Sequence, residues 1–278
     1  MNPAALYERL LEETRTLGTA SGRNLVAFSG GVDSALVAQA VFTVFPHSGE
    51  AVLGVSPSLS AEQRASAFQL AEHVGIPLRL VDTDEGADPV YIANEGLSCY
   101  VCKSVLYETM RRIDASLDGE KDVVLFNGTN ADDMIDPTRV GLRAAREYRV
   151  ASPLASYTKE EVRAMSRHAG LPNWNAAAAP CLRSRLQFGV PATAGHLARI
   201  DEAEQRLRAR FAFDAADNLR VRHLAGDAAM IEADSTKLPH LTQRECEAEL
   251  LPLGFTSVSL RAFVSGGVSG FRPPAVEQ

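Results

Sequence analysis

The residues with the clearest capacity for chemistry form the loop Ser29-Gly30-Gly31-Val32-Asp33-Ser34. An apolar run leads into this loop and another follows over residues 35–45, which is the pattern of a strand, a glycine-rich turn and a helix. Glycine lets the backbone turn tightly and approach a ligand closely. The unpaired N–H groups of a helix start make such a turn a phosphate site. The hydroxyls of Ser29 and Ser34 add donors, and Asp33 can hold a metal ion that rides on the phosphates.

The order of the glycines separates this loop from the two commonest phosphate-binding loops. It has no Gly-Lys-Ser/Thr ending, and it does not match G-x-G-x-x-G. The letters SGGVDS resemble the PP-loop of the ATP pyrophosphatases. That resemblance implies cleavage of Mg²⁺-bound ATP to AMP and pyrophosphate, with adenylylation of a substrate oxygen. The alternative interpretation is an ordinary Gly-Ser turn between a strand and a helix.

The elements around the loop are expected to form an open parallel sheet. Short apolar runs predict strands over 24–28, 51–55, 78–81 and 122–126, with a short fifth strand over 150–154. Helices are predicted over 4–18, 35–45, 60–74 and 158–169, the last opened by a capping box of Thr158 and Glu161. Strands and helices that alternate in this way indicate an α/β fold with helices on both faces of the sheet.

Polar groups also follow other strands of the predicted sheet. Ligands in open parallel sheets bind at the carboxyl ends of the strands. Ser56 follows the second strand, where we expect it to meet the adenosine part of a nucleotide. Gly128, Thr129 and Asp132 follow the fourth strand and are expected to complete the nucleotide site. For Asp132 the alternative interpretation is a helix N-cap.

A second, smaller domain is expected at the end of the chain. Residues 1–190 are predicted to form a PP-loop ATP pyrophosphatase domain, similar to the adenine nucleotide alpha hydrolases. Residues 191–278 are predicted to form an α+β domain for substrate binding or oligomerisation. Its expected elements are a long helix over 191–211, strands over 219–224, 228–233 and 257–263, and a helix near 241–251. We expect these strands to pair antiparallel.

The cysteines indicate which family of PP-loop proteins the chain resembles. Cys99 and Cys102 form a Cys-x-x-Cys pair, and Cys181 stands between Pro180 and Leu182. Together with the stretches NGTNADD, TRVGLRAAREYRVASPL, PCLRSRLQFG and LRVRHLAGD, they resemble the LarE family of ATP-dependent sulfur transferases, from about residue 10 to residue 265. The resemblance implies that the carboxylates of pyridinium-3,5-biscarboxylic acid mononucleotide are adenylylated and converted to thiocarboxylates. That step matures the nickel-pincer nucleotide cofactor of lactate racemase.

The same resemblance implies how the sulfur is supplied. Members with three cysteines bind a 4Fe-4S cluster, here on Cys99, Cys102 and Cys181, whose fourth iron carries an extra sulfide. Other members sacrifice one cysteine, here Cys181, which is left as dehydroalanine. Three thiolates leave one iron of such a cluster open, whereas zinc usually takes four protein ligands in a structural site. Structural zinc and free thiols remain alternatives, and Cys246, in a predicted helix, is interpreted as an ordinary partly buried thiol.

Charged side chains complete the expected substrate site. Arg220 and Arg222 alternate along a predicted strand and so point to one face. The resemblance implies that these two arginines bind the substrate phosphate, and the alternative is a solvated strand face. It also implies catalytic roles for Ser184 and Arg185 beside Cys181, and a metal site at Glu204 and Glu232. The six histidines show no spacing typical of metal ligands.

The composition fits a globular protein that acts on a small-molecule nucleotide. The 278 residues carry 28 Lys and Arg against 35 Asp and Glu, a net charge of −7, which argues against a protein that mainly coats nucleic acid. No apolar run approaches the roughly 20 residues that span a bilayer, and the start of the chain lacks a secretory signal. We therefore expect a cytoplasmic protein without a membrane partner. The resemblance also implies a homo-oligomer, and a transient sulfur donor is a further expected partner.

Two other functions remain open. A tRNA thiolase would share the ATP, cluster and sulfur chemistry, but it needs a basic surface that holds RNA. A non-catalytic nucleotide sensor would use the same α/β fold, because a fold does not determine a function. Such a sensor would bind nucleotide without releasing pyrophosphate, and it would leave the three cysteines unexplained.

Overall fold

The computed structural model describes residues 2–115, 122–136, 138–177, 180–214 and 217–264. The chain divides into two units. The first unit comprises Met1–Ser56, Ala61–Glu85 and Cys99–Ala178, and the second comprises Pro57–Ser60, Gly86–Ser98 and Ala179–Gln278. None of the helices in these described residues is long and apolar enough to cross a bilayer.

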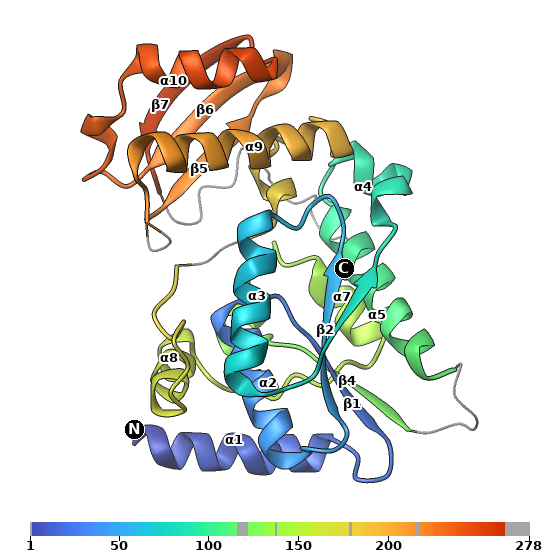
Figure 1. The fold of residues 1–278 in the computed structure, drawn as a ribbon. Coiled ribbons are helices and arrows are strands. Elements are labelled where there is room, and N and C mark those ends of the chain that lie inside the picture. The colour runs from blue at the N-terminus through green and yellow to red at the C-terminus, as the bar shows by residue number, and fades with distance from the viewer. Residues whose placement is uncertain (1, 116–121, 137, 178–179, 215–216, 265–278) are drawn as a thin grey trace. The chain divides into compact units, whose positions relative to one another are not determined.

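The first unit is built on a four-stranded sheet in which every neighbouring pair is parallel. The strands are β1 (Arg23–Ala27), β2 (Gly49–Val55), β3 (Leu78–Asp82) and β4 (Val123–Phe126), in the order β3-β2-β1-β4 (Figure 1). β1 lies inside this order and is buried along most of its length. The predicted α/β fold with a parallel sheet is therefore confirmed, because apolar runs of this kind suit strands that are covered on both faces.

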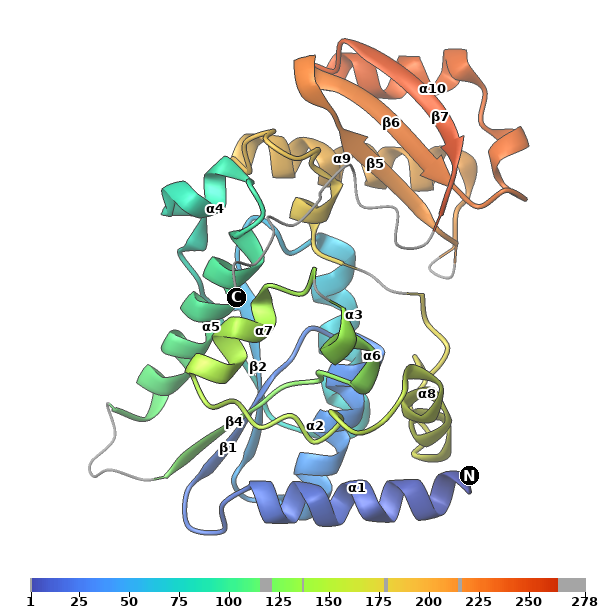
Figure 2. The ribbon, with the colours of Figure 1, turned by 180° about the vertical axis from the view of Figure 1, so that it is seen from behind.

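Helices cover both faces of this sheet. Their bounds are α1 (Pro3–Leu17), α2 (Val32–Val44), α3 (Ala61–Val74), α5 (Ser98–Ala115), α6 (Ala131–Ile135), α7 (Gly141–Glu147) and α8 (Lys159–His168). α5 and α7 lie on one face, where Tyr107 and Met110 pack against Leu25 and Leu125. α2, α3 and α8 lie on the other face (Figures 1 and 2). α2 has eight buried residues because it is enclosed by its neighbours as well as by the sheet.

The second unit has a three-stranded sheet with helices. Its elements are α4 (Pro89–Ala93), α9 (Ala194–Phe211), β5 (Leu219–His223), β6 (Ala228–Ala233), α10 (Gln243–Leu250) and β7 (Ser257–Ala262). β5 and β6 are antiparallel, but β7 runs parallel to β6, so the expectation of antiparallel pairing throughout was wrong. The reason lies in the connection, since α10 carries the chain back to the start of the sheet, as a parallel pair requires.

The predicted fifth strand over 150–154 was also wrong. Only Ala151 pairs with the sheet, as an isolated bridge to Phe126. The amide of Ala151 donates to Leu125 O (2.7 Å), and its carbonyl accepts from the amide of Asn127 (3.0 Å). Pro153, which has no N–H group, follows two residues later, and the chain turns there with a bond from the Ala155 amide to Ser152 O. The short helices α4, α6 and α7 were not predicted.

Candidate functional site

The loop Ser29–Ser34 lies where β1 ends and α2 begins. Gly30 has a φ of +72°, a conformation that glycine adopts at little cost. Gly31 stands at the N-cap of α2 with extended backbone and makes no side-chain capping bond. The Ser34 hydroxyl donates to Gly31 O (3.1 Å) and lies 3.2 Å from the Ser29 hydroxyl. The helix start therefore keeps its positive end open to an anion, which is the geometry of a phosphate site.

The loop that follows β4 packs directly on the phosphate loop at Gly128. A Cβ atom at Gly128 would lie 2.8 Å from both the Asp33 carbonyl carbon and the Ser34 nitrogen. Those atoms are backbone and cannot give way easily. Gly128 therefore permits the close approach of two strand-end loops, in agreement with the predicted grouping of these residues at one edge of the sheet.

Asp33 is the residue on which the neighbouring segments converge. The Lys159 ammonium lies 2.6 Å from Oδ1 and 2.5 Å from Oδ2 of Asp33. The Asn130 side-chain amide donates to Oδ1 at 3.2 Å. Both side chains are half-buried to buried, so the carboxylate is held by a cation and an amide at the mouth of the loop.

Neither Lys159 nor Asn130 was singled out by the sequence analysis. Lys159 is the first residue of α8, whose predicted capping box of Thr158 and Glu161 is confirmed. A cation at a helix start opposes the helix dipole. A lysine at this unfavourable position could have been recognised from the sequence as a residue with an acidic partner elsewhere in the chain. Asn130 caps α6 in a capping box with Asp133.

The other predicted nucleotide-binding residues lie in the first unit. Thr129 is buried, and its amide donates to the Asn127 side chain at 3.0 Å. Asp132 is exposed, and its Oδ2 accepts the Lys159 amide at 3.1 Å. Ser56 is half-buried directly after β2. The N-cap alternative for Asp132 is wrong, because Asn130 takes that position.

The predicted cluster cysteines belong to both units. Cys99 and Cys102 are half-buried near the start of α5. They are three residues apart, so they lie on the same side of the helix. Cys181 is half-buried in the second unit at the start of a short 3-10 helix, Leu182–Arg185. Cys246 is fully buried in α10, rather than partly, and burial raises the pKa of its thiol to about 11.

Arg185 braces the backbone around Cys181. Its guanidinium donates to Cys181 O (3.2 Å), to the Ser184 hydroxyl (3.2 Å) and to Pro180 O. The Ser184 hydroxyl donates to Cys181 O at 2.8 Å. The structure thus brings together the three residues for which the sequence predicted a joint catalytic role.

An ion pair connects this segment to α9, and a hydrogen bond from Arg222 connects it to β5. Arg185 pairs with Glu204 (3.0 Å) and Arg222 pairs with Glu232 (2.8 Å). Arg222 also donates to Ser184 O at 2.8 Å. Both glutamates are buried, and Glu232 accepts a further bond from Arg261 at 2.7 Å. The predicted metal role of Glu204 and Glu232 stays a prediction, since in this structure their carboxylates face arginines.

Arginine is in excess in this cluster. Burial, with repulsion from Arg185 and Arg222, lowers the pKa of Arg220 to about 10. Four guanidiniums, those of Arg185, Arg220, Arg222 and Arg261, lie around the two carboxylates of Glu204 and Glu232. Arg222 is only 3% exposed, so the alternative of a solvated strand face is wrong for this residue. The cluster is suited to an anionic ligand.

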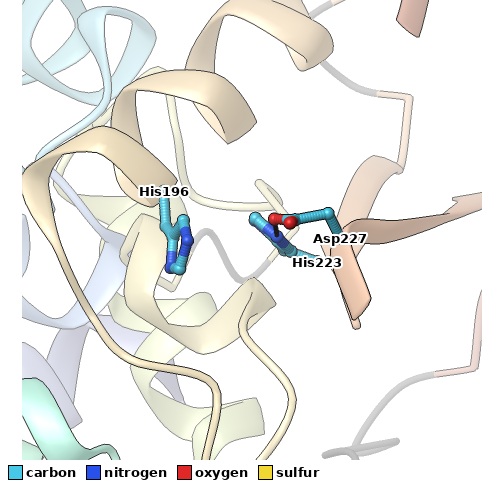
Figure 3. A group of neighbouring side chains, drawn as sticks. All are labelled: His196, His223 and Asp227. Atoms are coloured by element: carbon cyan, nitrogen blue, oxygen red, sulfur yellow. Dashed lines mark hydrogen bonds and ion pairs between the residues drawn. The ribbon is translucent and has the colours of Figure 1, made fainter. Parts of the chain in front are cut away.

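Two histidines of the second unit come together although their spacing in the sequence gave no indication of it. His196 lies in the first turn of α9 and His223 ends β5, and their ring centroids are 4.5 Å apart. Asp227 follows His223 after a tight turn, and its carboxylate bonds to the ring of His223 (Figure 3). Pairing in space across 27 positions of sequence leaves no local pattern that sequence reasoning could use.

Comparisons with known proteins agree with this fold and loop. The parallel sheet with a glycine-rich loop at the end of β1 is consistent with a PP-loop domain. The chain is 30% identical to the pyridinium-3,5-bisthiocarboxylic acid mononucleotide synthase of Lactiplantibacillus plantarum over 86% of this chain and 85% of that one. It therefore belongs to the LarE family.

Two uncharacterised proteins are also similar. One, of Synechocystis, is 41% identical over 73% of this chain and 75% of its own. The other, of Methanocaldococcus jannaschii, is 25% identical over 66% of this chain and 69% of its own. No family model matches the chain.

Proposed function

We propose that this protein is an ATP-dependent sulfur transferase that converts the carboxylates of pyridinium-3,5-biscarboxylic acid mononucleotide to thiocarboxylates for a nickel-pincer nucleotide cofactor. The substrate class comes from the relative of Lactiplantibacillus plantarum, whose name states the bisthiocarboxylic acid product. The observation that carries the ATP part is the convergence of Gly128, Asn130 and Lys159 on Asp33 at the open start of α2.

The phosphate loop would activate the substrate. A carboxylate oxygen of the mononucleotide attacks the α-phosphorus of ATP, and pyrophosphate leaves with the electron pair of the broken P–O bond. The amides at the start of α2 hold phosphate oxygens. Asp33 would hold Mg²⁺, which would neutralise charge on the leaving pyrophosphate. The Lys159 ammonium then turns from Asp33 to the phosphates, where it stabilises the same charge.

The arginine cluster of the second unit would bind the mononucleotide. Its phosphate and carboxylates are anions, and four arginines of the cluster surround two glutamates. Arginine forms bidentate bonds with both groups. Burial, together with repulsion from Arg185 and Arg222, disfavours the charged form of Arg220. An anionic ligand relieves that repulsion, so binding there is favoured electrostatically.

Sulfur transfer completes the reaction. A sulfur nucleophile attacks the acyl carbon of the adenylate, a C–S bond forms, and AMP leaves with the electrons of the C–O bond. Cys99, Cys102 and Cys181 would hold a 4Fe-4S cluster that supplies sulfide. Thiolates are the donors that such a cluster takes, and all three thiols are half-buried, with two of them three residues apart on α5. Arg185 and Ser184 hold the backbone of Cys181 in place.

Anaerobic assay of the purified protein tests the proposal. We expect about four irons per chain with an iron–sulfur absorption band. ATP and the mononucleotide together should yield pyrophosphate, AMP and a thiocarboxylate product. Cys99→Ala should lose iron and product but still release pyrophosphate, whereas the control Cys246→Ala should keep both, because Cys246 is buried away in α10.

Other outcomes separate the parts of the proposal. Absence of substrate-dependent pyrophosphate release would overturn it entirely and favour a nucleotide sensor. An iron-free protein that still forms product, with a mass loss of one H₂S per chain, would replace the cluster by Cys181 as the sulfur donor. Activity on tRNA instead of the mononucleotide would identify a tRNA thiolase.

A further inference from the structure

A polar cavity in the second unit is lined by two histidines and an aspartate. Its volume is about 290 Å³, and residues 189–191, 196 and 223–227 line it. One ligand atom each from His196, His223 and Asp227 lies within 4.8 Å of the other two (Figure 3). None of these residues belongs to the phosphate loop, the cysteines or the arginine cluster.

His196 is held in the orientation of a metal ligand. Its Nδ1 lies 2.7 Å from Pro191 O. Because a carbonyl oxygen only accepts, Nδ1 carries the proton and Nε2 keeps a free lone pair. Histidines that bind metals typically donate their second ring N–H to a carbonyl or carboxylate in this way. The half-buried ring thus presents a basic nitrogen to the cavity.

His223 has an unexplained nitrogen. The side chain is 1% exposed, and its Nδ1 has no hydrogen-bond partner in the described part of the chain. Its Nε2 lies 2.9 Å from Asp227 Oδ1. A buried polar atom without a partner costs free energy, so an occupant bonded to Nδ1 of His223 would account for this arrangement.

Asp227 supplies the one carboxylate among the three side chains, and Arg199 positions it. Arg199 donates to Asp227 Oδ1 at 2.8 Å and fixes the carboxylate from the side. Carboxylates that bind metals are commonly held by such a second bond.

We propose that His196, His223 and Asp227 form a binding site for Zn²⁺ or a similar divalent transition metal. Two imidazoles and a carboxylate are ligands that zinc prefers, with bonds of about 2.0–2.2 Å. Because the three donor atoms lie within 4.8 Å of one another, rotations about the side-chain bonds would let a single ion reach all of them. Three protein ligands leave a fourth position open, as in zinc sites that also bind water or a small ligand.

Cobalt titration tests this site without any assay of enzyme activity. The protein is stripped of metal and carries Cys99→Ser, Cys102→Ser and Cys181→Ser, so that thiolates do not compete. We expect one Co²⁺ per chain, visible d–d bands without a sulfur charge-transfer band, and displacement by Zn²⁺. His196→Ala and Asp227→Asn should each weaken Co²⁺ binding by about tenfold to a hundredfold. His240→Ala changes an exposed histidine of the same unit and should leave binding unchanged.

A second measurement keeps the test decisive if a variant misfolds. Zn²⁺ added to the cysteine-free protein should shift the ring resonances of His196 and His223, and leave those of the other histidines in place. His196→Gln keeps a polar side chain at this half-buried position and should abolish the shift of His223. Lack of binding, or binding that survives both His196→Ala and Asp227→Asn, would overturn the proposal.

Discussion

The ammonium group of Lys159 lies 2.6 Å and 2.5 Å from the two carboxylate oxygens of Asp33. The pair joins the first turn of α8 to the first turn of α2, although the residues are 126 positions apart. Each side chain neutralises the other. Under the proposed function, magnesium-bound ATP would offer both a better partner, since Mg²⁺ would bind the carboxylate and the phosphates would bind the ammonium.

Lys159→Gln should therefore reduce catalysis more than stability. We expect substrate-dependent pyrophosphate release to fall about 10²- to 10³-fold, the usual cost of removing one stabilising contact to a developing charge. The melting temperature should change little, because partly exposed ion pairs contribute little to stability. Lys237→Gln removes a comparable surface pair with Asp217 and is the control. Equal effects of the two variants on pyrophosphate release would refute the role of Lys159.

Two glycines of the nucleotide site should respond differently to alanine. A Cβ atom at Gly31 meets only the Ser29 hydroxyl at 3.6 Å, and its φ of −76° suits any residue. Gly31→Ala should therefore fold normally but lose ATP binding in calorimetry, since the added methyl group would stand in the proposed phosphate site. Gly128→Ala should also lower the melting temperature, because its Cβ would collide with the Asp33 backbone. Normal ATP binding by Gly31→Ala would contradict the phosphate site.

Replacing Arg220 should weaken substrate binding without lowering the stability of the protein. The pKa of Arg220, about 10 in the folded protein, lies below the ordinary value of an arginine, so folding disfavours the charged form. The resulting penalty is fully present below pH 10 and is relieved as the pH rises above that value. At neutral pH, Arg220→Met should melt no lower than the wild type. Its KM for the mononucleotide should rise about tenfold or more, because bonds to charged groups contribute about 1.5–3 kcal/mol.

A matched substitution separates this effect from a general loss of charge. Arg206→Met removes a surface arginine of α9 that pairs with Glu202. Both the KM and the melting temperature of this control should stay close to wild type. A clear loss of stability in Arg220→Met, with an unchanged KM, would remove Arg220 from the substrate site.

Glu204→Gln distinguishes an ion-pair role of Glu204 from the predicted metal role. The carboxylate is buried and accepts bonds from Arg185 and from the Val221 amide. Removing its charge leaves Arg185 buried without its partner, so the free energy of unfolding should fall by about 3–5 kcal/mol. Urea denaturation of the metal-free protein measures this change. A stable Glu204→Gln variant that has lost a bound metal ion would support the metal role instead.

Cys246 should be the unreactive cysteine of the four. With a pKa of about 11, only about one thiol in a thousand is ionised at pH 8. A maleimide reagent at pH 8 should modify Cys99, Cys102 and Cys181 in the iron-free protein and spare Cys246, as mass spectrometry of peptides would show. The raised pKa also means that stability present below pH 9 is lost as pH rises through 11. Rapid labelling of Cys246 at pH 8 would show that α10 opens readily.

Local signals explain how much of the fold was predictable. β1 and β2 follow from short apolar runs, and α8 follows from the capping box of Thr158 and Glu161, which a few neighbouring residues determine. The direction of β7 was missed, because pairing with β6 depends on how the chain returns through α10. The isolated bridge at Ala151 was read as a strand, since an apolar run cannot show how many residues pair.

The candidate site was predictable only where a motif is continuous. Asp33 and Gly128 stand in recognisable stretches that follow strands, and the structure brings them together. Lys159 lies 126 positions after Asp33 in the sequence, so no local pattern predicts that the two side chains pair. The same reason hides His196 and His223, which become neighbours only when α9 packs beside β5.

The second unit has a consequence for the order of events during synthesis, since its parts come from three separate stretches of chain. The side chain of Asn94 donates to Gln187 O (2.8 Å) and Val190 O (3.0 Å), residues 93 and 96 positions later. A ribosome that adds about 5–20 residues per second needs roughly 5–20 s to make that distance. During this interval, Asn94 at the end of α4 has been synthesised but its partners at residues 187 and 190 have not. Residues 86–98 of the second unit therefore wait, without most of that unit, while residues 99–178 of the first unit are synthesised.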